Sequence, residues 1–306
     1  MPVVIRPAEL RDVPRLVEVF DAVLLEGHGV VMGPEDGADM HAVAERVDSA
    51  ERLLVVESDG EVVGEGSLRC LGPSWLAHVG LLAMHLHPEA QGRGLGRQLL
   101  RALVQDARAQ GLERLELYVR ADNPRAIGLY RSEGFVLEGI RRAFVRPPGV
   151  AAVDDLLMAR FLHEPAAEKV VALVVRDAEL LVLGHPLAGW QLPKGTLEPE
   201  ETPVDGVLRE LAEESGLTDV AVRRALTPWD QPTDETDADG RPVLHRLHGF
   251  VMEPRGPLPE RWSWRPTGST EEEALRFDFA WQPLRHASLH PAFGEVLVRL
   301  RAALER

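Results

Sequence analysis

Between residues 203 and 215, apolar positions recur with the period of an α-helix, and acidic residues lie beside them. The apolar stripe is formed by Val204, Val207, Leu208, Leu211 and Ser215. Thr202 is a typical N-cap, Pro203 suits the first helical position, and Gly216 is a typical helix stop. This pattern predicts a helix with one packed face and one carboxylate face.

A second pattern, between residues 79 and 111, is an apolar strand followed by a glycine loop and an amphipathic helix. The strand covers Val79–Leu86, and the loop reads Gln91-Gly-Arg-Gly-Leu-Gly96. The buried face of the helix consists of Leu99, Leu100, Leu103, Val104 and Ala107. Such a loop presents bare N–H groups and the positive end of a helix dipole, which suits a pyrophosphate. A tight turn without a ligand is the alternative.

The length of 306 residues, 45% of them hydrophobic, indicates two domains with a core each. A short segment with a proline separates the two patterns, so we expect domains at 1–163 and 168–306 and a linker at 164–167. Residues 1–163 hold 18 basic and 24 acidic residues, and the remainder hold 16 and 25. Because neither half is basic, we expect no polymeric nucleic acid as a partner.

The cysteine content and the apolar runs predict a cytoplasmic protein. Cys70 is the single cysteine, which excludes an internal disulfide and fits a reducing compartment. Apolar runs such as Val170–Val175 are too short to span a bilayer, and the first ten residues lack the apolar region of a signal peptide. We therefore expect no membrane partner.

The acidic face of the predicted helix belongs to a longer, regularly spaced string. Its members are Gly195, Glu201, Arg209, Glu210, Leu211, Glu213, Glu214, Gly216 and Leu217. Glu210, Glu213 and Glu214 share one helical face and repel each other unless a cation lies among them. Hard oxygen ligands favour Mg²⁺ or a similar ion, which usually accompanies a substrate phosphate. A solvated acidic helix is the alternative, because like-charge pairs on a helix cost only roughly a few tenths of a kcal/mol.

The complete string resembles the signature of the Nudix hydrolases, which fold as an α/β/α sandwich. The resemblance implies Glu201, Arg209 and Glu210 as catalytic residues, and Glu210, Glu213 and Glu214 as ligands of Mg²⁺ (or Mn²⁺). It further implies that water attacks a pyrophosphate in a nucleoside diphosphate derivative. A nucleotide-sensing domain without turnover, which regulates the first half, is the alternative function.

Three other features of the second half leave alternatives open. Lys194 is one of only two lysines and directly precedes Gly195. Either its ammonium group binds a phosphate as a positive point charge, or a lysine stands at this position by chance. One residue of Glu271–Glu273 is a candidate for a further base or metal ligand. The segment Arg261–Arg265 alternates Arg and Trp, and either stacks a nucleobase or forms a strand with one buried tryptophan face.

The first half resembles the GNAT N-acetyltransferases over residues 3–162. The resemblance rests on Gln91-x-x-Gly94-x-Gly96 and on Asn123-Pro-Arg-Ala-Ile-Gly-Leu-Tyr130-Arg-Ser-Glu-Gly-Phe135, which follows a strand predicted at Leu115–Val119. It implies an α+β fold with a mixed central sheet. It also implies acetyl transfer from acetyl-CoA to a primary amine of a small molecule or a protein N-terminus. The whole chain is thus expected to be an α+β / α/β two-domain protein.

The same resemblance implies roles for individual residues. Met84, His85 and Leu86 would pair with the pantetheine arm of acetyl-CoA, and Asn123 would contact that arm. The residues implied in pyrophosphate binding are Gln91, Gly92, Arg93, Gly94, Leu95, Gly96 and Arg97. Tyr130 would protonate the departing thiolate. The alternative is that Tyr130 only packs in the core as an aromatic residue.

The general base of the first half is left open by the sequence. Many GNATs carry a glutamate on the strand before the loop, where this chain has Leu81. His78, His85 or a water chain could replace it, although a lone histidine is more often structural. The departure also leaves open that the first half is a binding scaffold.

Overall fold

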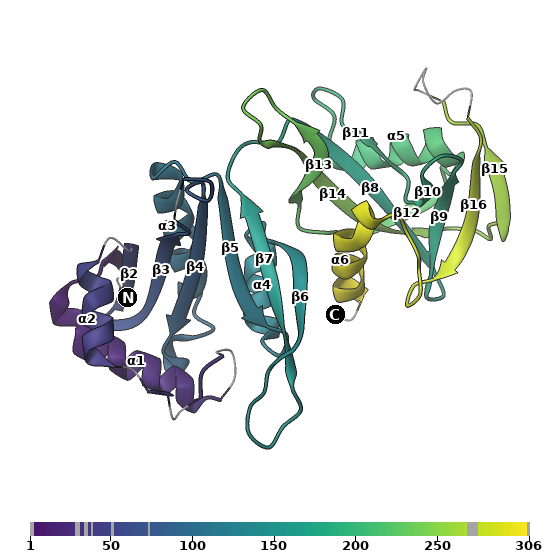
Figure 1. The fold of residues 1–306 in the computed structure, drawn as a ribbon. Helices are drawn as coiled ribbons and strands as arrows, with labels where there is room; N and C mark the ends of the chain where they lie inside the picture. Colours follow the sequence, from purple (N-terminus) through teal and green to yellow (C-terminus); the bar gives the residue numbers. More distant parts are fainter. Residues whose placement is uncertain are drawn as a thin grey trace. The chain divides into compact units, whose positions relative to one another are not determined.

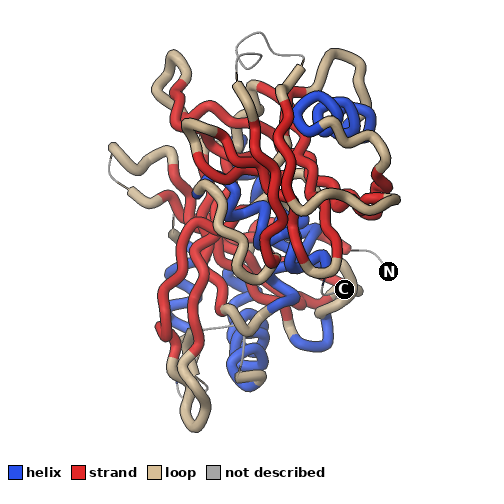
Figure 2. Tube along the Cα trace, turned by 90° about the vertical axis from the view of Figure 1, so that its right-hand side faces the viewer, coloured by secondary structure: helices blue, strands red, loops and turns tan. Residues whose placement is uncertain are grey.

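The computed structural model describes residues 3–27, 31–33, 36–37, 39–49, 52–72, 74–267 and 275–304. The chain divides into two compact units, Met1–His163 and Glu164–Arg306, and each combines a sheet with flanking helices (Figure 1, Figure 2). No helix within these ranges has the length and apolar character needed to cross a membrane.

The first unit is an α+β domain with a seven-stranded mixed sheet (Figure 1). Its strands are β1 (Val3–Pro7), β2 (Arg52–Ser58), β3 (Glu61–Cys70), β4 (Val79–Leu86), β5 (Arg114–Arg120), β6 (Val136–Val145) and β7 (Val153–Phe161). Its helices are α1 (Val13–Leu25), α2 (Met40–Asp48), α3 (Leu95–Ala109) and α4 (Pro124–Ser132), with 3-10 turns η1 (Leu10–Asp12) and η3 (Pro88–Ala90). The strand order is β1-β2-β3-β4-β5-β7-β6, in which the pair β4–β5 is parallel.

The two faces of this sheet carry separate cores. On one face, α3 buries Leu99 and Leu103, and a Cβ at Gly66 of β3 would lie 2.6 Å from Leu103 Cδ1. Glycine at this position therefore allows the helix to approach the strand closely. On the other face, α1 and α2 pack against β2 through a cluster that includes Leu16 and Val55.

The parallel pairing of β4 with β5 is short. It joins Val79–Leu81 to residues 114–116. Beyond it, residues 82–86 of β4 have no strand partner on that side in the described chain. The backbone N–H and C=O groups of alternate residues in this stretch point away from β3 and form an open edge that can accept an extended ligand.

The second unit is an α/β/α sandwich on one mixed sheet. Its strands are β8 (Ala167–Arg176), β9 (Glu179–His185), β10 (Gly189–Gln191), β11 (Lys194–Thr196), β12 (Val220–Ala225), β13 (Trp229–Thr236), β14 (Pro242–Pro254), β15 (Arg261–Trp264) and β16 (Phe277–Pro283). Its helices are α5 (Pro203–Ser215) and α6 (Gly294–Leu304), with a 3-10 turn η4 (Pro291–Phe293). The order is β12-β14-β8-β9-β16-β15, with β10 on β9, β11 on β8 and β13 on β14. Strand β8 starts at Ala167, one residue inside the segment predicted as linker.

Alternate residues of β8 face the two helices of this unit. One cluster contains Val170, Ala172 and Val174 of β8 together with Val207 and Leu211 of α5. The intervening Val171 and Leu173 are also buried and must point to the opposite face, because side chains alternate along a strand. Helix α6 covers that face (Figure 1). Burial on both faces explains why this strand is continuously apolar.

Candidate functional sites

Helix α5 carries the acidic residues, and its ends are fixed by the residues that the sequence predicts. At the start, Thr202 Oγ1 accepts a hydrogen bond from Asp205 N at 3.2 Å. At the end, Gly216 has a φ of +76° and its N–H donates to Ala212 O. The predicted helix over 203–215 is confirmed.

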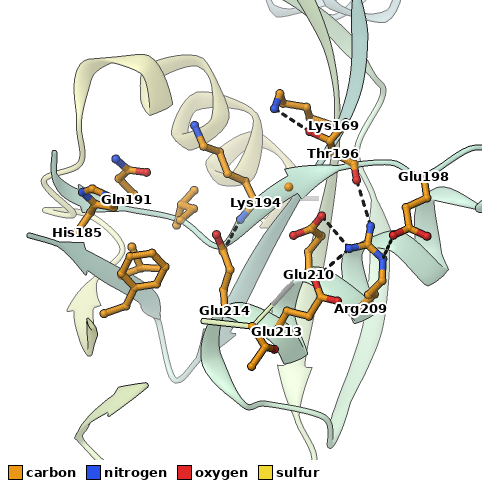
Figure 3. Close-up of a pocket in the computed structure, with 15 residues that line it drawn as sticks. Lys169, His185, Gln191, Lys194, Thr196, Glu198, Arg209, Glu210, Glu213 and Glu214 are labelled. Atoms are coloured by element: carbon orange, nitrogen blue, oxygen red, sulfur yellow. Dashed lines mark hydrogen bonds and ion pairs between the residues drawn. The ribbon is translucent and has the colours of Figure 1, made fainter. Parts of the chain in front are cut away.

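Arg209 holds the carboxylates of this helix in a network (Figure 3). Its Nε and Nη2 donate to the two oxygens of Glu201, both at 2.9 Å. Its Nη1 donates to Glu210 Oε1 at 3.0 Å and to Glu213 Oε2 at 3.1 Å. A planar guanidinium suits such forked bonding, so Arg209 fixes the directions of three glutamates at once.

These contacts set the protonation of the network. Hydrogen bonds from Arg209 lower the pKa of Glu201, and the same bonds raise the pKa of Arg209. Burial raises the pKa of Glu210, aided by the charge of Glu213 and opposed by Arg209. Glu201 and Arg209 therefore remain charged, whereas Glu210 takes up a proton more readily than a free glutamate.

Gly195 is needed for space and not for an unusual backbone conformation. It lies within strand β11, and its φ is not in the left-handed region. A Cβ there would lie 1.8 Å from Glu210 Cδ, so the carboxyl group of Glu210 occupies the space that a side chain would fill. The glycine therefore admits a carboxylate rather than bending the chain.

The carboxylate face has the donor chemistry of a site for a hard cation. Arg209 binds one oxygen of Glu210 and one of Glu213, which leaves the second oxygen of each for another partner. Glu214 Oε2 accepts a hydrogen bond from Lys194 N at 2.9 Å. Among the residues that the structure describes, no three His, Cys, Asp or Glu side chains already form a metal-binding group. The oxygen donors are nevertheless those that Mg²⁺ prefers, and their mutual repulsion favours a cation.

The three glutamates line a cavity of about 520 Å³, together with both lysines of the chain. Lys169 and Lys194 lie on the paired strands β8 and β11, and Lys169 Nζ donates to Thr196 Oγ1 at 2.9 Å. Burial and the charges of both lysines lower the pKa of His245 on β14. The cavity therefore joins an acidic side to a basic side. Lys169 and Thr196 were not predicted as site residues, although the scarcity of lysine could have indicated the first.

The cavity extends to polar side chains that no motif indicates. His185 and Gln191 line it on the far side of Lys194 from Arg209 (Figure 3). His185 Nδ1 accepts hydrogen bonds from Leu187 N at 3.2 Å and Ala188 N at 3.1 Å. Its neutral form therefore carries the proton on Nε2 and offers a donor.

The Arg–Trp segment forms strand β15, as the second interpretation predicts, but its tryptophan face is only partly buried, because Trp264 is 38% exposed. Trp262 Nε1 donates to Ser215 O, and Trp264 Nε1 donates to Glu213 O, both at 3.0 Å. Both indoles thus satisfy carbonyl groups at the C-terminus of α5. The candidates Glu271–Glu273 lie outside the described residues.

In the first unit, the predicted glycine loop precedes α3 as expected. Gly92 and Gly94 have φ values of +74° and +79°, and Gly94 is the N-cap of α3 without a side-chain cap. The side chain of Gln91 stabilises the loop with two hydrogen bonds. Its Nε2 donates to Leu86 O, and its Oε1 accepts from Arg125. The loop thus exposes main-chain N–H groups at a helix start, the arrangement that binds phosphate.

The other loop residues divide between packing and charge. Leu95 and Gly96 are buried at the start of α3, so they can contribute main-chain groups alone. Arg93 approaches Ser58 Oγ at 3.4 Å, and Arg97 donates to Ser132 Oγ at 3.0 Å. Arg97 also forms an ion pair with Glu133 at 3.0 Å, so its charge is partly neutralised.

The residues predicted on β4 point to two different faces. Met84 and Leu86 lie next to Gly96 of α3, whereas His85 points to the opposite face because side chains alternate. Leu81 shares the face of His85, and the exposed His78 precedes the strand at its other end. His78 is therefore remote from the glycine loop.

Asn123 and Tyr130 lie at the two ends of α4. Asn123 Oδ1 accepts from Ala126 N at 3.1 Å and caps the helix, so its amide group alone remains for a ligand. Tyr130 is buried beside Phe135, and burial raises its pKa to about 12. No hydrogen bond to its hydroxyl is found within the described residues, and the hydroxyl stays protonated at neutral pH.

The fold and the sites define a chain of two enzyme domains, one with a glycine loop at the start of a helix and one with a carboxylate helix. A model of the acetyltransferase (GNAT) family matches residues 25–135, and a model of the NUDIX domain matches residues 166–299. The chain therefore joins a GNAT acetyltransferase domain to a NUDIX domain, and both predicted resemblances are confirmed.

The chain is also similar to solved structures and to curated relatives. The structure of yncA from Salmonella typhimurium with its cofactor acetyl-CoA has a TM-score of 0.50 and 24% identity, over 55% of this chain and 98% of that one. The GNAT acetyltransferase of Streptococcus pneumoniae has a TM-score of 0.49 and 26% identity, over 52% and 99%. The RNA pyrophosphohydrolases of Halorhodospira halophila and Zymomonas mobilis are 42% and 48% identical over 64 and 50 residues, which are 19% and 15% of this chain. The chain spans 35% and 32% of the length of these two relatives.

Proposed function

We propose that the chain is bifunctional. Its second domain would hydrolyse a pyrophosphate in a nucleoside diphosphate derivative, with Mg²⁺ (or Mn²⁺), and its first domain would acetylate a primary amine with acetyl-CoA. The observation that carries the hydrolase is the cavity shared by Glu210, Glu213 and Glu214 with the chain's two lysines. Carboxylates can hold a metal and lysines can meet phosphate oxygens, so a diphosphate fits between the two sides.

Each residue of the cavity has a distinct part in this proposal. Bound Mg²⁺ would neutralise charge on the phosphate oxygens and lower the pKa of a coordinated water. Glu210, Glu213 and Glu214 would hold the ion, while Arg209 keeps the first two in place and is itself fixed by Glu201. The lysines bind phosphate oxygens on the opposite side and orient the bond to be cleaved.

A hydrolysis screen with Mg²⁺ and Mn²⁺ tests the hydrolase. The panel contains nucleoside diphosphate sugars, dinucleoside polyphosphates and nucleoside triphosphates, with phosphate or nucleotide release as the readout. We expect metal-dependent release from at least one diphosphate-containing member. Binding by calorimetry without any release would instead support the nucleotide-sensing alternative.

RNA with a 5′-triphosphate is a second candidate substrate. The resemblance to two RNA pyrophosphohydrolases favours it, whereas the acidic character of residues 164–306 disfavours a long RNA partner. A short 5′-triphosphorylated RNA and its free nucleoside triphosphate form one matched pair in the screen. A higher kcat/KM for the RNA would select this candidate.

The acetyltransferase proposal is carried by the open edge of β4 next to the glycine loop. The main-chain groups of residues 84–86 that point away from β3 would meet the pantetheine arm, and the N–H groups of residues 92–97 would face the pyrophosphate. Tyr130 is protonated and can supply a proton to the thiolate. Calorimetry with acetyl-CoA tests the site, and release of free thiol with a panel of amines and N-terminal peptides tests the transfer. No acetyl-CoA binding would leave the first domain as a scaffold.

A further inference from the structure

A buried carboxylate lies in the middle of the first unit's sheet. Glu65 of β3 is 2% exposed, and its Oε2 is buried without a hydrogen-bond partner in the described chain. A charge in such a place is costly unless other groups compensate it. None of the roles proposed above uses this residue.

Its compensating partners come from the neighbouring strand and from α2. Glu65 pairs across the strands with His85 of β4, and His85 Nδ1 lies 3.7 Å from Glu65 Oε1. Arg46 of α2 approaches the same Oε1 at 3.4 Å. Burial acts to raise the pKa of Glu65, but His85 and Arg46 outweigh it, and the pKa lies below its usual value. Glu65 is therefore ionised at neutral pH.

The imidazole ring of His85 is held in one orientation. Phe20 of α1 packs edge-on against it, with ring centroids 5.2 Å apart. The ionised Glu65 favours a proton on the adjacent Nδ1, which leaves Nε2 of the neutral ring as an acceptor. His85 is 22% exposed, so the ring is accessible while Glu65 is not.

The position of His85 relates this pair to acetyl transfer. His85 lies on the open part of β4, beyond the pairing with β5, and it points away from the face that α3 covers. Acetyl-CoA lying along this edge would bring its thioester beside His85. An amine arriving on the face of α1 and α2 would meet Nε2.

We infer that His85 is the general base of the acetyltransferase and that Glu65 is the positioning residue that orients it. The inference rests on the proposed acetyl transfer. The amine nitrogen attacks the thioester carbon, a C–N bond forms and the C–S bond breaks. The amine proton passes to His85 Nε2, and the thiolate takes a proton from Tyr130. Glu65 stays ionised and stabilises the imidazolium.

An affinity label tests the geometry without any acceptor amine. Bromoacetyl-CoA would place its reactive carbon beside His85, where an N–C bond forms at Nε2 and bromide leaves. The experiment uses the full chain with Cys70→Ser, because Cys70 is exposed and would also react. We expect one adduct on His85 by mass spectrometry, prevented by excess CoA. A CoA-protected adduct at another residue would overturn the inference and leave the proposed function intact.

Slow cleavage of acetyl-CoA by water gives the kinetic test. His85→Gln is expected to lower free-thiol release by about 10²-fold, the usual scale for a positioned base. Glu65→Gln is expected to lower it by about 10-fold or more, and to move the rising limb of the pH profile to lower pH because the imidazolium loses its partner. His78→Gln, the matched control, is expected to change neither. An unmoved pH profile in Glu65→Gln would overturn the positioning role.

Measurement of acetyl-CoA binding distinguishes failure of the proposed function from failure of the inference about His85. Calorimetry that shows no acetyl-CoA binding to the wild-type chain contradicts the proposed function and, with it, the inference. Normal acetyl-CoA binding with full thiol release in His85→Gln contradicts the inference alone. If His85→Gln fails to fold, the adduct position and the Glu65→Gln pH profile still decide.

Discussion

The hydrolase site and the acetyltransferase site of this chain are built from different groups. In the proposed hydrolase site, charged side chains lie on one helix face, and Arg209 fixes their directions. In the acetyltransferase, the groups are mainly backbone N–H and C=O at an interrupted strand pair and a glycine loop. Charge substitutions should therefore have their largest effect on the first site, and changes of backbone conformation should have theirs on the second.

The largest effect is expected for Glu213→Gln/Glu214→Gln. Loss of metal should lower metal-dependent hydrolysis by about 10³-fold, because a metal supplies several kcal/mol and each 1.4 kcal/mol is tenfold. Phosphate release and metal affinity by calorimetry measure the change. Glu200→Gln, an exposed residue that does not line the cavity, is the control. Equal hydrolysis in the double variant would remove the proposed hydrolase site, whereas acetyl transfer should persist.

The second largest effect is expected for Tyr130→Phe. It keeps the buried ring and removes the proton donor, so kcat for acetyl transfer should fall by about 10²-fold. The affinity for acetyl-CoA should change little, since backbone groups bind the cofactor. Full activity would reduce Tyr130 to a packing residue.

A third prediction compares two glycines with the same backbone conformation. Gly94→Val and Gly111→Val both place a side chain at a φ near +75°, and a Cβ meets nothing within 4 Å at either position. Both should destabilise the fold by about 1–2 kcal/mol through backbone strain. Gly94→Val alone should weaken acetyl-CoA binding, by about tenfold or more, because it blocks approach to the loop N–H groups. Equal affinities in calorimetry would show that the loop does not hold the pyrophosphate.

Two glycines of the hydrolase domain allow a second comparison, in which the room for an added Cβ atom differs. Gly195→Ala places a Cβ on the Glu210 carboxyl group, whereas Gly256→Ala meets no atom within 4 Å. The first should lower the free energy of unfolding by about 1–3 kcal/mol, as overpacking does, and displace Glu210. The second should be near neutral. Denaturant unfolding and hydrolysis rates are measured for both variants. Unchanged stability and activity in Gly195→Ala would contradict the close approach of the Glu210 carboxyl group to Gly195.

The smallest expected effect is the dependence of stability on the ionisation of Tyr130. Burial raises its pKa to about 12, so the hydroxyl remains a competent acid through the physiological range. A raised pKa favours the folded state at lower pH, and this contribution is lost as the pH rises from about 10, the usual tyrosine value, toward 12. Ultraviolet titration of Tyr118→Phe, which leaves Tyr130 as the single tyrosine, measures the value. Ionisation near 10 would show that the hydroxyl is solvated.

Sequence reasoning succeeded where the site is contiguous and failed where strands bring distant residues together. The limits of α5 and its carboxylate face follow from Thr202, Gly216 and the i, i+3, i+4 spacing. The pair Glu65–His85 depends on the register of β3 against β4, twenty residues apart, which no local pattern specifies. Lys169 enters the cavity only because β8 pairs with β11.

Local sequence patterns also did not predict which contacts individual residues make. The string includes Gly195 without indicating why a glycine stands there, and the structure shows that it makes room for Glu210. That contact depends on how α5 packs against β11, which is tertiary information. The tryptophans of β15 likewise gain their partners only once that strand lies beside the end of α5.

The two lysines of this chain have a consequence for chemical labelling. Both lysines of the 306 residues line one cavity. An amine-reactive reagent will therefore modify the side chains of a single site, where most proteins would react over their whole surface. Protection of Lys169 and Lys194 from such a reagent, read by mass spectrometry, reports occupancy of that cavity by any candidate substrate without knowledge of its turnover.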